Sequence, residues 1–351
     1  MWRTACGHSA SRCGKFEALR SECELMRRRE FIALLGGAAA IWPLGAHAQQ
    51  PAMPVVGYLS QGSAESDDVR LAGLRLGLAE AGHVEGRNVT IEYRWAANQI
   101  DRLPALAADL LQHRVAVIVT PGLFSTFAAK AATSTVPIVF VTGNDPVQLG
   151  LVASLNRPGG NVTGYSVFRL ETDAKRLEVL HELLPATASV GFLVDPRSPN
   201  AELETREVLG ASRAIGVKIQ TLHAATEGEI DTAFASLAQA RSGGLVVTDD
   251  IFFNDRITQL VALAARYAVP TVYSIREFPL AGGLMSYGIS RAETYRLIGL
   301  QVARILVGQK PADLPVIQST KIELAINLKT TKVLGIMVPQ SLLARADEVI
   351  E

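Results

Sequence analysis

Short apolar runs rich in valine and isoleucine alternate with amphipathic helical patterns along almost the whole chain after residue 54. Continuous apolar strands are typical of parallel sheets that helices cover on both faces. The strands predicted in the first half are 55–59, 89–93, 115–120, 138–141 and 162–165. The helices predicted between them are 69–81, 101–112 with Asp101 as its cap, and 125–132. This order indicates an α/β protein.

The pattern starts again in the second half. The predicted helices are 171–184, 200–214, 226–241 and 256–267, and the predicted strands are 190–194, 217–222, 245–247 and 271–273. No linker rich in Ser, Gly or Pro separates the halves, so we expect short crossings between them. Without its first 48 residues, the chain of 351 still reaches the roughly 250–300 residues at which single cores stop growing. We therefore predict two doubly wound parallel-sheet lobes with a ligand cleft between them, because open sheets bind ligands beyond their strands' carboxyl ends.

The first 48 residues have the order of a secretory signal. Three arginines at 27–29 precede an apolar run at 31–44, and the small-x-small sequence 46–48 follows it. A positive region, a short apolar region and a small-residue cleavage site define such a signal. The apolar run is too short to span a bilayer stably. We expect residues 1–48 to be leader and signal peptide, cleaved near Ala48, and the mature protein to be periplasmic.

Two details of the leader stay open. Met26 stands directly before the arginines, so it is the probable start, and residues 1–25 then come from the choice of start site. Arg28 and Arg29 also resemble the twin-arginine export signal, whose alternative is the general secretory route. A non-cleaved anchor or a buried helix is the other interpretation of the apolar run.

Composition argues against several classes of site. The three cysteines, Cys6, Cys13 and Cys23, all lie in the leader, which leaves the mature chain without disulfides, thiolate metal sites or cysteine catalysis. The chain has 34 basic and 34 acidic residues, and no basic excess remains after the leader, so nucleic acid is a poor candidate partner.

Asp249 and Asp250 lack an evident third metal ligand. We find no nucleophile elbow, phosphate-binding loop, dinucleotide fingerprint or zinc motif. A solute receptor without cofactor or metal is favoured over an enzyme.

Several motifs carry a family resemblance. They are Asn144-Asp145-Pro146-Val147-Gln148-Leu149-Gly150-Leu151-Val152, Asn156-Arg157-Pro158-Gly159-Gly160-Asn161-Val162-Thr163-Gly164, Leu284-Met285-Ser286-Tyr287-Gly288, Asn327-Leu328-Lys329-Thr330, Leu334-Gly335 and Val338-Pro339. With the opening strand and Gly86-Arg87-Asn88-Val89, the chain resembles ABC transporter substrate-binding proteins of the tryptophan/tyrosine-binding type over residues 54–350.

That resemblance implies a type I periplasmic-binding-protein fold with three crossings. The N-terminal lobe would take 54–166 and 285–317, and the C-terminal lobe would take 167–284 and 318–351. It also implies a monomeric receptor that binds a small solute, closes on it, and docks on an ABC permease in the inner membrane. The expected ligand is an amino acid or another carboxylate, aromatic ones included. A sensory receptor for a signalling protein and, as a weaker alternative, a periplasmic enzyme remain open.

The carboxyl ends of the predicted strands supply the candidate ligand-binding residues. In the first lobe they are Ser60, Gln61, Ser63, Gly122, Ser125, Thr126, Thr142 and Asp145. In the second lobe they are Asp195, Asn200, Asp249, Phe252 and Arg276. Bare N–H groups at a helix start near Ser125 favour a carboxylate. By family position Asp249 matches the acid of relatives, and Asp250 replaces an amide.

Each candidate has an alternative structural role. Ser125 and Thr126 would only cap a helix, and Asp145 would only organise a turn. Phe252 would be core or hinge packing. Arg276 would pair locally with Glu277.

Overall fold

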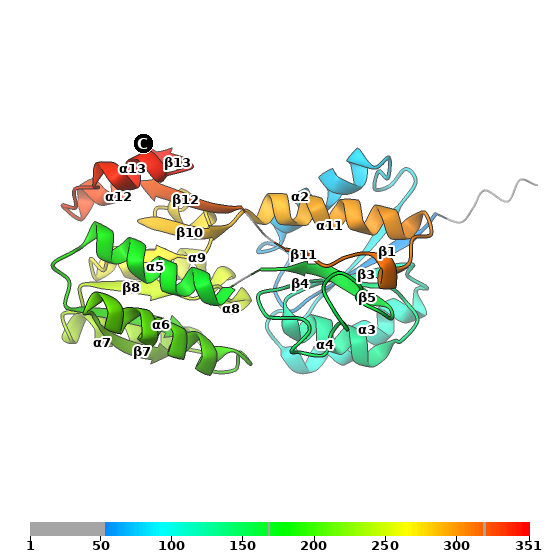
Figure 1. The fold of residues 1–351 in the computed structure, drawn as a ribbon, viewed down its shortest axis with the longest axis horizontal. Helices are drawn as coiled ribbons and strands as arrows, with labels where there is room; N and C mark the ends of the chain where they lie inside the picture. Colours follow the sequence, from blue (N-terminus) through cyan, green and yellow to red (C-terminus); the bar gives the residue numbers. More distant parts are fainter. Residues whose placement is uncertain (1–52, 168, 319–320) are drawn as a thin grey trace, which may run out of the picture. The chain divides into compact units, whose positions relative to one another are not determined.

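The computed structural model describes residues 53–167, 169–318 and 321–351. The predicted leader, with its arginines and cleavage site, lies outside the described residues. Residues from Ala52 to Glu351 form one unit, and Figure 1 shows two sheets in it, each flanked by helices. The predicted α/β fold of two parallel-sheet lobes is confirmed.

The first lobe is built on a six-stranded sheet whose strands all pair in parallel. Its strand order is β11 (Ile317–Gln318), β5 (Val162–Ser166), β4 (Ile138–Thr142), β3 (Val117–Pro121), β1 (Val55–Ser60) and β2 (Thr90–Trp95). Its helices are α2 (Asp68–Glu80), η1 (Ile100–Arg102), α3 (Leu103–Gln112), α4 (Leu123–Ala132), α11 (Arg291–Leu306) and η2 (Pro311–Asp313).

Alternating side chains of the central strands face two separate cores. Val117 and Val119 of β3 pack with α2 and α11, whereas Ile118 packs with α3 and α4. Successive side chains of a strand point to opposite faces, so both faces of this sheet are covered. That burial explains why β3 and β4 are apolar without alternation.

The second lobe is built on a seven-stranded sheet. Its strand order is β13 (Glu348–Ile350), β12 (Ile322–Asn327), β10 (Met285–Ile289), β9 (Thr271–Tyr273), β8 (Gly244–Val247), β6 (Ser189–Val194) and β7 (Lys218–His223). Its helices are α5 (Arg169–Leu183), α6 (Ala201–Ile215), α7 (Glu227–Gln239), α8 (Ile251–Asn254), α9 (Ile257–Arg266), α10 (Glu277–Leu280), α12 (Leu328–Val333) and α13 (Gln340–Arg345). Only the β10–β12 pair is antiparallel. Among the described residues, no helix has the length and apolar character needed to cross a membrane.

One predicted lobe boundary differs from the observed sheets. Residues 285–289 were expected in the first lobe, but they form β10, which pairs with β9 on one side and β12 on the other. Both edges of this strand are therefore occupied within the second sheet. The crossing lies at Ser290, and Arg291 begins the helix that returns to the first lobe.

Two predicted helix starts were also wrong. The helix expected from residue 125 begins at Leu123, with Gly122 as its N-cap at φ 83°. Asp101 does not cap a helix but lies inside η1. Thr226 and Glu229, in contrast, form a capping box at the start of α7.

Glycines allow α2 and α11 to pack very closely. A Cβ atom on Gly77 would lie 1.9 Å from the Arg296 carbonyl oxygen, and one on Gly299 would lie 2.4 Å from the Leu74 carbonyl oxygen. Gly73 faces Ala292 in the same way, so the contacts advance together along both helices, which therefore run parallel. Their N-terminal ends meet at the same end of the first lobe.

We expect Gly77→Ala to destabilise the protein by about 1–3 kcal/mol, because the added methyl group must push two backbones apart. Urea unfolding measures the effect. Gly210→Ala is the matched control, since a Cβ on this helical glycine meets nothing within 4 Å, and the change should raise stability by up to about 1 kcal/mol. Equal effects of the two substitutions would contradict the close packing of α2 against α11.

Candidate ligand-binding cleft

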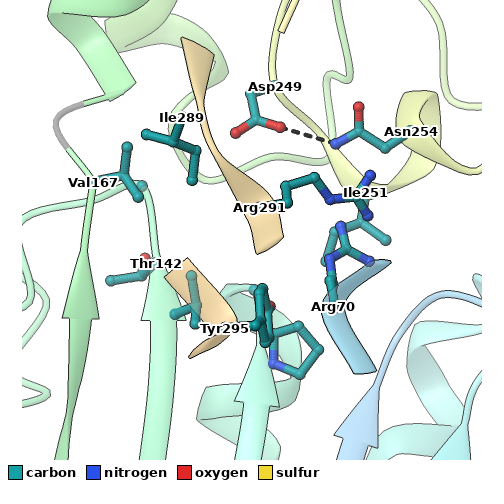
Figure 2. Close-up of a pocket in the computed structure, with 13 residues that line it drawn as sticks. Arg70, Thr142, Val167, Asp249, Ile251, Asn254, Ile289, Arg291 and Tyr295 are labelled. Carbon is teal, nitrogen blue, oxygen red and sulfur yellow. Dashed lines mark hydrogen bonds between the residues drawn. The ribbon is translucent and has the colours of Figure 1, made fainter. Parts of the chain in front are cut away.

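The two sheets direct strand ends toward a cleft that contains a cavity of about 50 Å³ (Figure 2). Its first-lobe wall comes from the ends of β3 and β4, and its second-lobe wall comes from the segment after β8. The lining residues are Arg70, Pro121, Gly122, Val141, Thr142, Gly143, Val167, Asp249, Ile251, Asn254, Ile289, Arg291 and Tyr295. We call this cavity the inner compartment.

A second cavity of about 30 Å³ adjoins it, and we call this the outer compartment. It shares Gly122, Thr142, Gly143 and Ile251 with the inner compartment, and its other lining residues are Gln61, Leu123, Phe124, Asn144, Ser198, Pro199, Asn200 and Asp250. The start of α4 thus borders the outer compartment, whereas Asp249 borders the inner one.

Gly122 and Ile251 meet across the cleft between the compartments. A Cβ atom on Gly122 would lie 2.6 Å from Cδ1 of Ile251, so the isoleucine side chain would have to move for a larger residue, and the φ of 83° favours glycine as well. Pockets that hold small ligands usually have about 300–1,000 Å³. Each compartment is far smaller than that, so a ligand of this size would need the lobes to separate at this contact.

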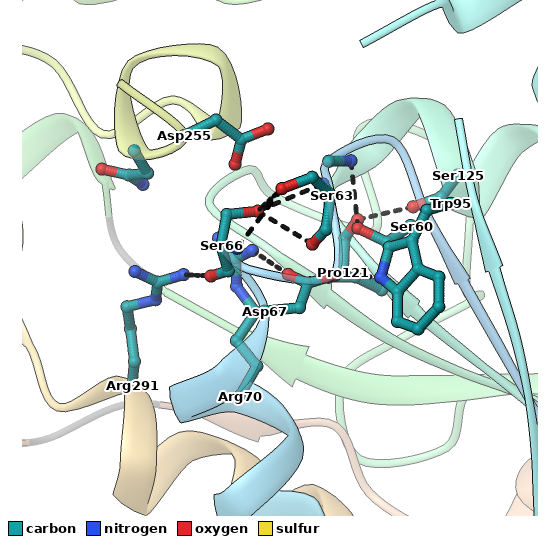
Figure 3. Close-up of polar contacts among 12 residues, drawn as sticks. Ser60, Ser63, Ser66, Asp67, Arg70, Trp95, Pro121, Ser125, Asp255 and Arg291 are labelled. Carbon is teal, nitrogen blue, oxygen red and sulfur yellow. Dashed lines mark hydrogen bonds and ion pairs between the residues drawn. The ribbon is translucent and has the colours of Figure 1, made fainter. Parts of the chain in front are cut away.

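Two buried arginines line the inner compartment, and both come from the packed ends of α2 and α11. Arg70 is 5% exposed and forms an ion pair with Asp67 (Figure 3). The other carboxylate oxygen of Asp67 accepts a hydrogen bond from Trp95 Nε1 at 3.1 Å. Burial acts to lower the pKa of Arg70, but Asp67 outweighs it and holds the pKa above its usual value. Arg70 is therefore a firmly paired cation.

Arg291 is less well paired. Its Nη2 donates to the Ser66 carbonyl oxygen at 3.0 Å, and its Nη1 lies 4.0 Å from the nearest Glu277 oxygen. Its Nε has no hydrogen-bond partner among the described residues. Burial, together with the neighbouring charge of Arg70, lowers the pKa of Arg291.

Asp249 lies on the opposite wall of the inner compartment, after β8 (Figure 2). Asn254 Nδ2 donates to its Oδ1 at 2.9 Å, and Ser274 Oγ donates to the Asn254 amide oxygen at 3.2 Å. These hydrogen bonds orient the carboxylate. The inner compartment therefore offers a fixed anion on one wall and cations on the other.

The predicted hydroxyl donors at α4 are used inside the first lobe. Ser125 Oγ donates to the Pro121 carbonyl at 2.5 Å, and Thr126 Oγ1 donates to the Gly122 carbonyl at 2.7 Å. Both residues are fully buried. Ser60 is also fully buried, and its Oγ accepts from the Gly62 N–H at 3.1 Å. None of the three hydroxyls borders a compartment.

Other predicted residues lie away from the two compartments. Asp145 is exposed, and its Oδ1 accepts from the Val147 N–H at 2.8 Å, which organises a turn. Ser63 Oγ contacts Ser66 at 3.5 Å. Arg276 pairs with Glu348 of β13 at 3.0 Å, rather than with Glu277.

Phe252 and Asp195 belong to a layer of the second lobe behind the cleft wall. Phe252 is 2% exposed, and its ring centroid lies 4.0 Å from the guanidinium carbon of Arg256 and 5.0 Å from that of Arg197. Arg197 in turn pairs with the buried Asp195 at 2.6 Å. The predicted residues that line the cleft are Gln61, Gly122, Thr142, Asn200 and Asp249.

Sequence reasoning missed Arg70, Asn254, Arg291 and Tyr295, which all line the inner compartment. The strand-end rule, by which ligands bind beyond the carboxyl ends of parallel strands, fits Arg291, which follows the strand at 285–289. Arg70 lies in the first turn of the helix predicted at 69–81 and not at a strand end, so this rule does not reach it. Asn254 is the last residue of the short helix α8, seven residues after the end of β8.

A polar contact also joins the lobes beside the arginines. Asn98, in the loop after β2, donates its Nδ2 hydrogen to Asp255 Oδ2 at 2.8 Å. Burial raises the pKa of Asp255, although Ser66, Asn98 and Arg70 act against that rise, and the Asp67 charge adds to it. Below its raised pKa, Asp255 is neutral and costs less to hold in this contact.

We expect Asp255→Asn to flatten the pH dependence of thermal stability. Between the unfolded pKa of about 4 and the raised native pKa, the native protein binds more protons at Asp255 than the unfolded chain does. The contribution of Asp255 to the stability of the wild-type protein therefore falls as pH rises through that window. Melting temperatures from pH 4 to 8 should show the fall in wild type and in the exposed-site control Asp313→Asn, but a smaller one in Asp255→Asn. Identical pH profiles of wild type and Asp255→Asn would refute this account.

Comparisons with known proteins agree with this architecture. A curated tyrosine-binding protein of Clostridioides difficile is 26% identical over 257 residues, which cover 73% of this chain and 74% of that protein. A crystal structure of a conserved domain protein from Vibrio cholerae has a TM-score of 0.78 at 26% identity, covering 85% of this chain and 99% of that one.

A structure from Streptococcus pneumonia in complex with L-Trp has a TM-score of 0.76 at 24% identity, with the same coverage of both chains. The family model described as ABC transporter substrate binding protein matches residues 59–350. That match spans both lobes and every residue of the cleft, and the chain belongs to the ABC transporter substrate-binding protein family.

Proposed function

We propose that this protein is the periplasmic receptor of an ABC importer and that its cleft binds an amino acid or another carboxylate, aromatic ones included. One observation carries the proposal: the inner compartment has a carboxylate, Asp249, on the second-lobe wall and a buried guanidinium, Arg291, on the other side. A zwitterion matches two opposite charges in one cavity. The tyrosine-binding relative and the L-Trp complex support a ligand of this class.

The ammonium group of such a ligand would pair with Asp249. Oδ1 of Asp249 accepts a hydrogen bond from Asn254, so the carboxylate is oriented before the ligand arrives. The carboxylate of the ligand has two possible sets of donors. One is the first N–H groups of α4, at Leu123 and Phe124, which have no partner within the helix; the other is Arg291.

Binding would stabilise the closed arrangement of the lobes. The ligand has to enter while Gly122 and Ile251 are apart, and it can favour closure only by binding the closed form more tightly than the open form. A closed, occupied receptor would then dock as a monomer on its permease in the inner membrane.

The proposal gives the cleft no catalytic role. We assign the charged groups of the cleft to recognition because the family to which the chain belongs is described by substrate binding.

Asp249→Asn should weaken an amino-acid ligand by roughly a hundredfold, because the ammonium group loses its charged partner in a site shielded from water. The asparagine oxygen can still accept the hydrogen bond from Asn254, so the apo protein should keep its melting temperature. A thermal-shift screen against the twenty amino acids and aromatic acids selects the ligand, and calorimetry then measures the affinities.

Asp313→Asn, an exposed aspartate in η2, is the matched control and should bind like wild type. If the selected ligand bound equally well to Asp249→Asn, the ammonium would not lie at this residue. If no amino acid or carboxylate bound to the wild type, the proposed ligand class would be wrong.

The expected signal peptide leads to a separate prediction about export. Mature protein recovered from the periplasm should begin at about Gln49, because the small-x-small sequence ends at Ala48. N-terminal sequencing of the periplasmic fraction tests this. Replacing Arg28 and Arg29 with lysine should reduce export if the twin-arginine route is used, and unchanged export would point to the general secretory route. Mature protein that retained residues 31–44 would contradict the signal.

A further inference from the structure

Arg291 lies directly beside a crossing between the two lobes. It is the first residue of α11, directly after the crossing at Ser290 from the second lobe to the first. Its guanidinium reaches the Ser66 carbonyl of the first lobe and comes within 4.0 Å of Glu277 of the second lobe. The side chain is 6% exposed and lines the inner compartment (Figure 2).

The charge of Arg291 is incompletely compensated by the protein. Of the two carboxylate oxygens of Asp67, the N-cap residue of α2, one pairs with Arg70 and the other accepts a hydrogen bond from Trp95, so both are engaged (Figure 3). Glu277 stays at 4.0 Å, and its second oxygen is buried without a hydrogen-bond partner among the described residues. The Nε of Arg291 is likewise buried without a hydrogen-bond partner among the described residues. A buried charge without close pairing is costly.

The grouping of the lining residues favours one of the two possible donors for the ligand's carboxylate. The α-ammonium and α-carboxylate of an amino acid are attached to one carbon atom, so their partners must lie close to each other. Arg291 and Asp249 both line the inner compartment. Leu123 and Phe124, which begin α4, line only the outer compartment, beyond the contact between Gly122 and Ile251.

We propose that Arg291 binds the α-carboxylate of the ligand in the inner compartment, opposite Asp249, while the ligand's side chain extends toward the outer compartment. The inference rests on the proposed function, since it needs a carboxylate ligand in the same cleft. A guanidinium presents paired N–H groups that match a carboxylate, and such bonds are about twice as strong as neutral ones. The ligand's carboxylate would supply the partner that Nε lacks.

The test compares three related ligands by calorimetry on the full exported protein. L-tryptophan carries both charged groups, tryptamine lacks the carboxylate, and indole-3-propionate lacks the ammonium. In Arg291→Gln, L-tryptophan and indole-3-propionate should bind about ten- to a hundredfold more weakly than in wild type, whereas tryptamine should change less than about threefold. L-tyrosine, tyramine and 3-(4-hydroxyphenyl)propionate form the matching series for a phenol side chain.

Arg276→Gln is the control, because this exposed arginine pairs with Glu348 and lines neither compartment. Arg291→Lys covers the case in which the glutamine variant does not fold. Lysine keeps the charge but cannot bind a carboxylate with two parallel N–H groups. The ligands that carry a carboxylate should therefore still lose more affinity than tryptamine and tyramine, which lack one.

If the ligands with a carboxylate and the ligands without one lost affinity equally, Arg291 would have a structural role and the inference would be overturned. Wild-type affinity of L-tryptophan or L-tyrosine in both Arg291 variants would overturn it as well, while leaving the proposed function intact. If wild type bound no member of either series, the proposed aromatic ligand class and the inference would fail together, and that result is visible before any variant is made.

Discussion

The close parallel packing of α2 against α11 is the contact on which the cleft depends. Gly77 and Gly299 let the two backbones approach to a distance that no side chain would permit. Because the helices run parallel, their first turns end together at the cleft, and Arg70 and Arg291 become neighbours there. Residues separated by more than two hundred positions thus meet through a close approach of two helix backbones.

This arrangement places two cations together in a site shielded from water, which opposes folding. Asp67 offsets the charge of Arg70, but Arg291 keeps only a backbone oxygen and a distant carboxylate. Groups in such a condition are typical of functional sites, where stability is given up for recognition. A bound carboxylate would complete the pairing and so favour the closed form, which links ligand affinity to lobe closure.

The crossing at Ser290 connects ligand binding directly to the relative position of the two lobes. β10 is held on both edges within the second sheet, and α11 is packed against the first sheet. Arg291 begins α11 directly after the crossing, and Asn98 and Asp255 also join the lobes. A ligand held between Asp249 and Arg291 would therefore contact the second lobe and the crossing together, so its binding would act where the lobes must move.

The alternation of apolar strands with helices was enough to predict the two parallel-sheet lobes, because that pattern depends on neighbours within a few residues of each other. The motifs around 144–164 indicated the family, and the strand-end rule found Gly122, Thr142 and Asp249. Only the tertiary structure decided that 285–289 is a strand of the second sheet, that the Ser125 and Thr126 hydroxyls are used internally, and that Arg70 adjoins Arg291. These outcomes depend on which distant segments pair, and local periodicity carries no information about lateral pairing.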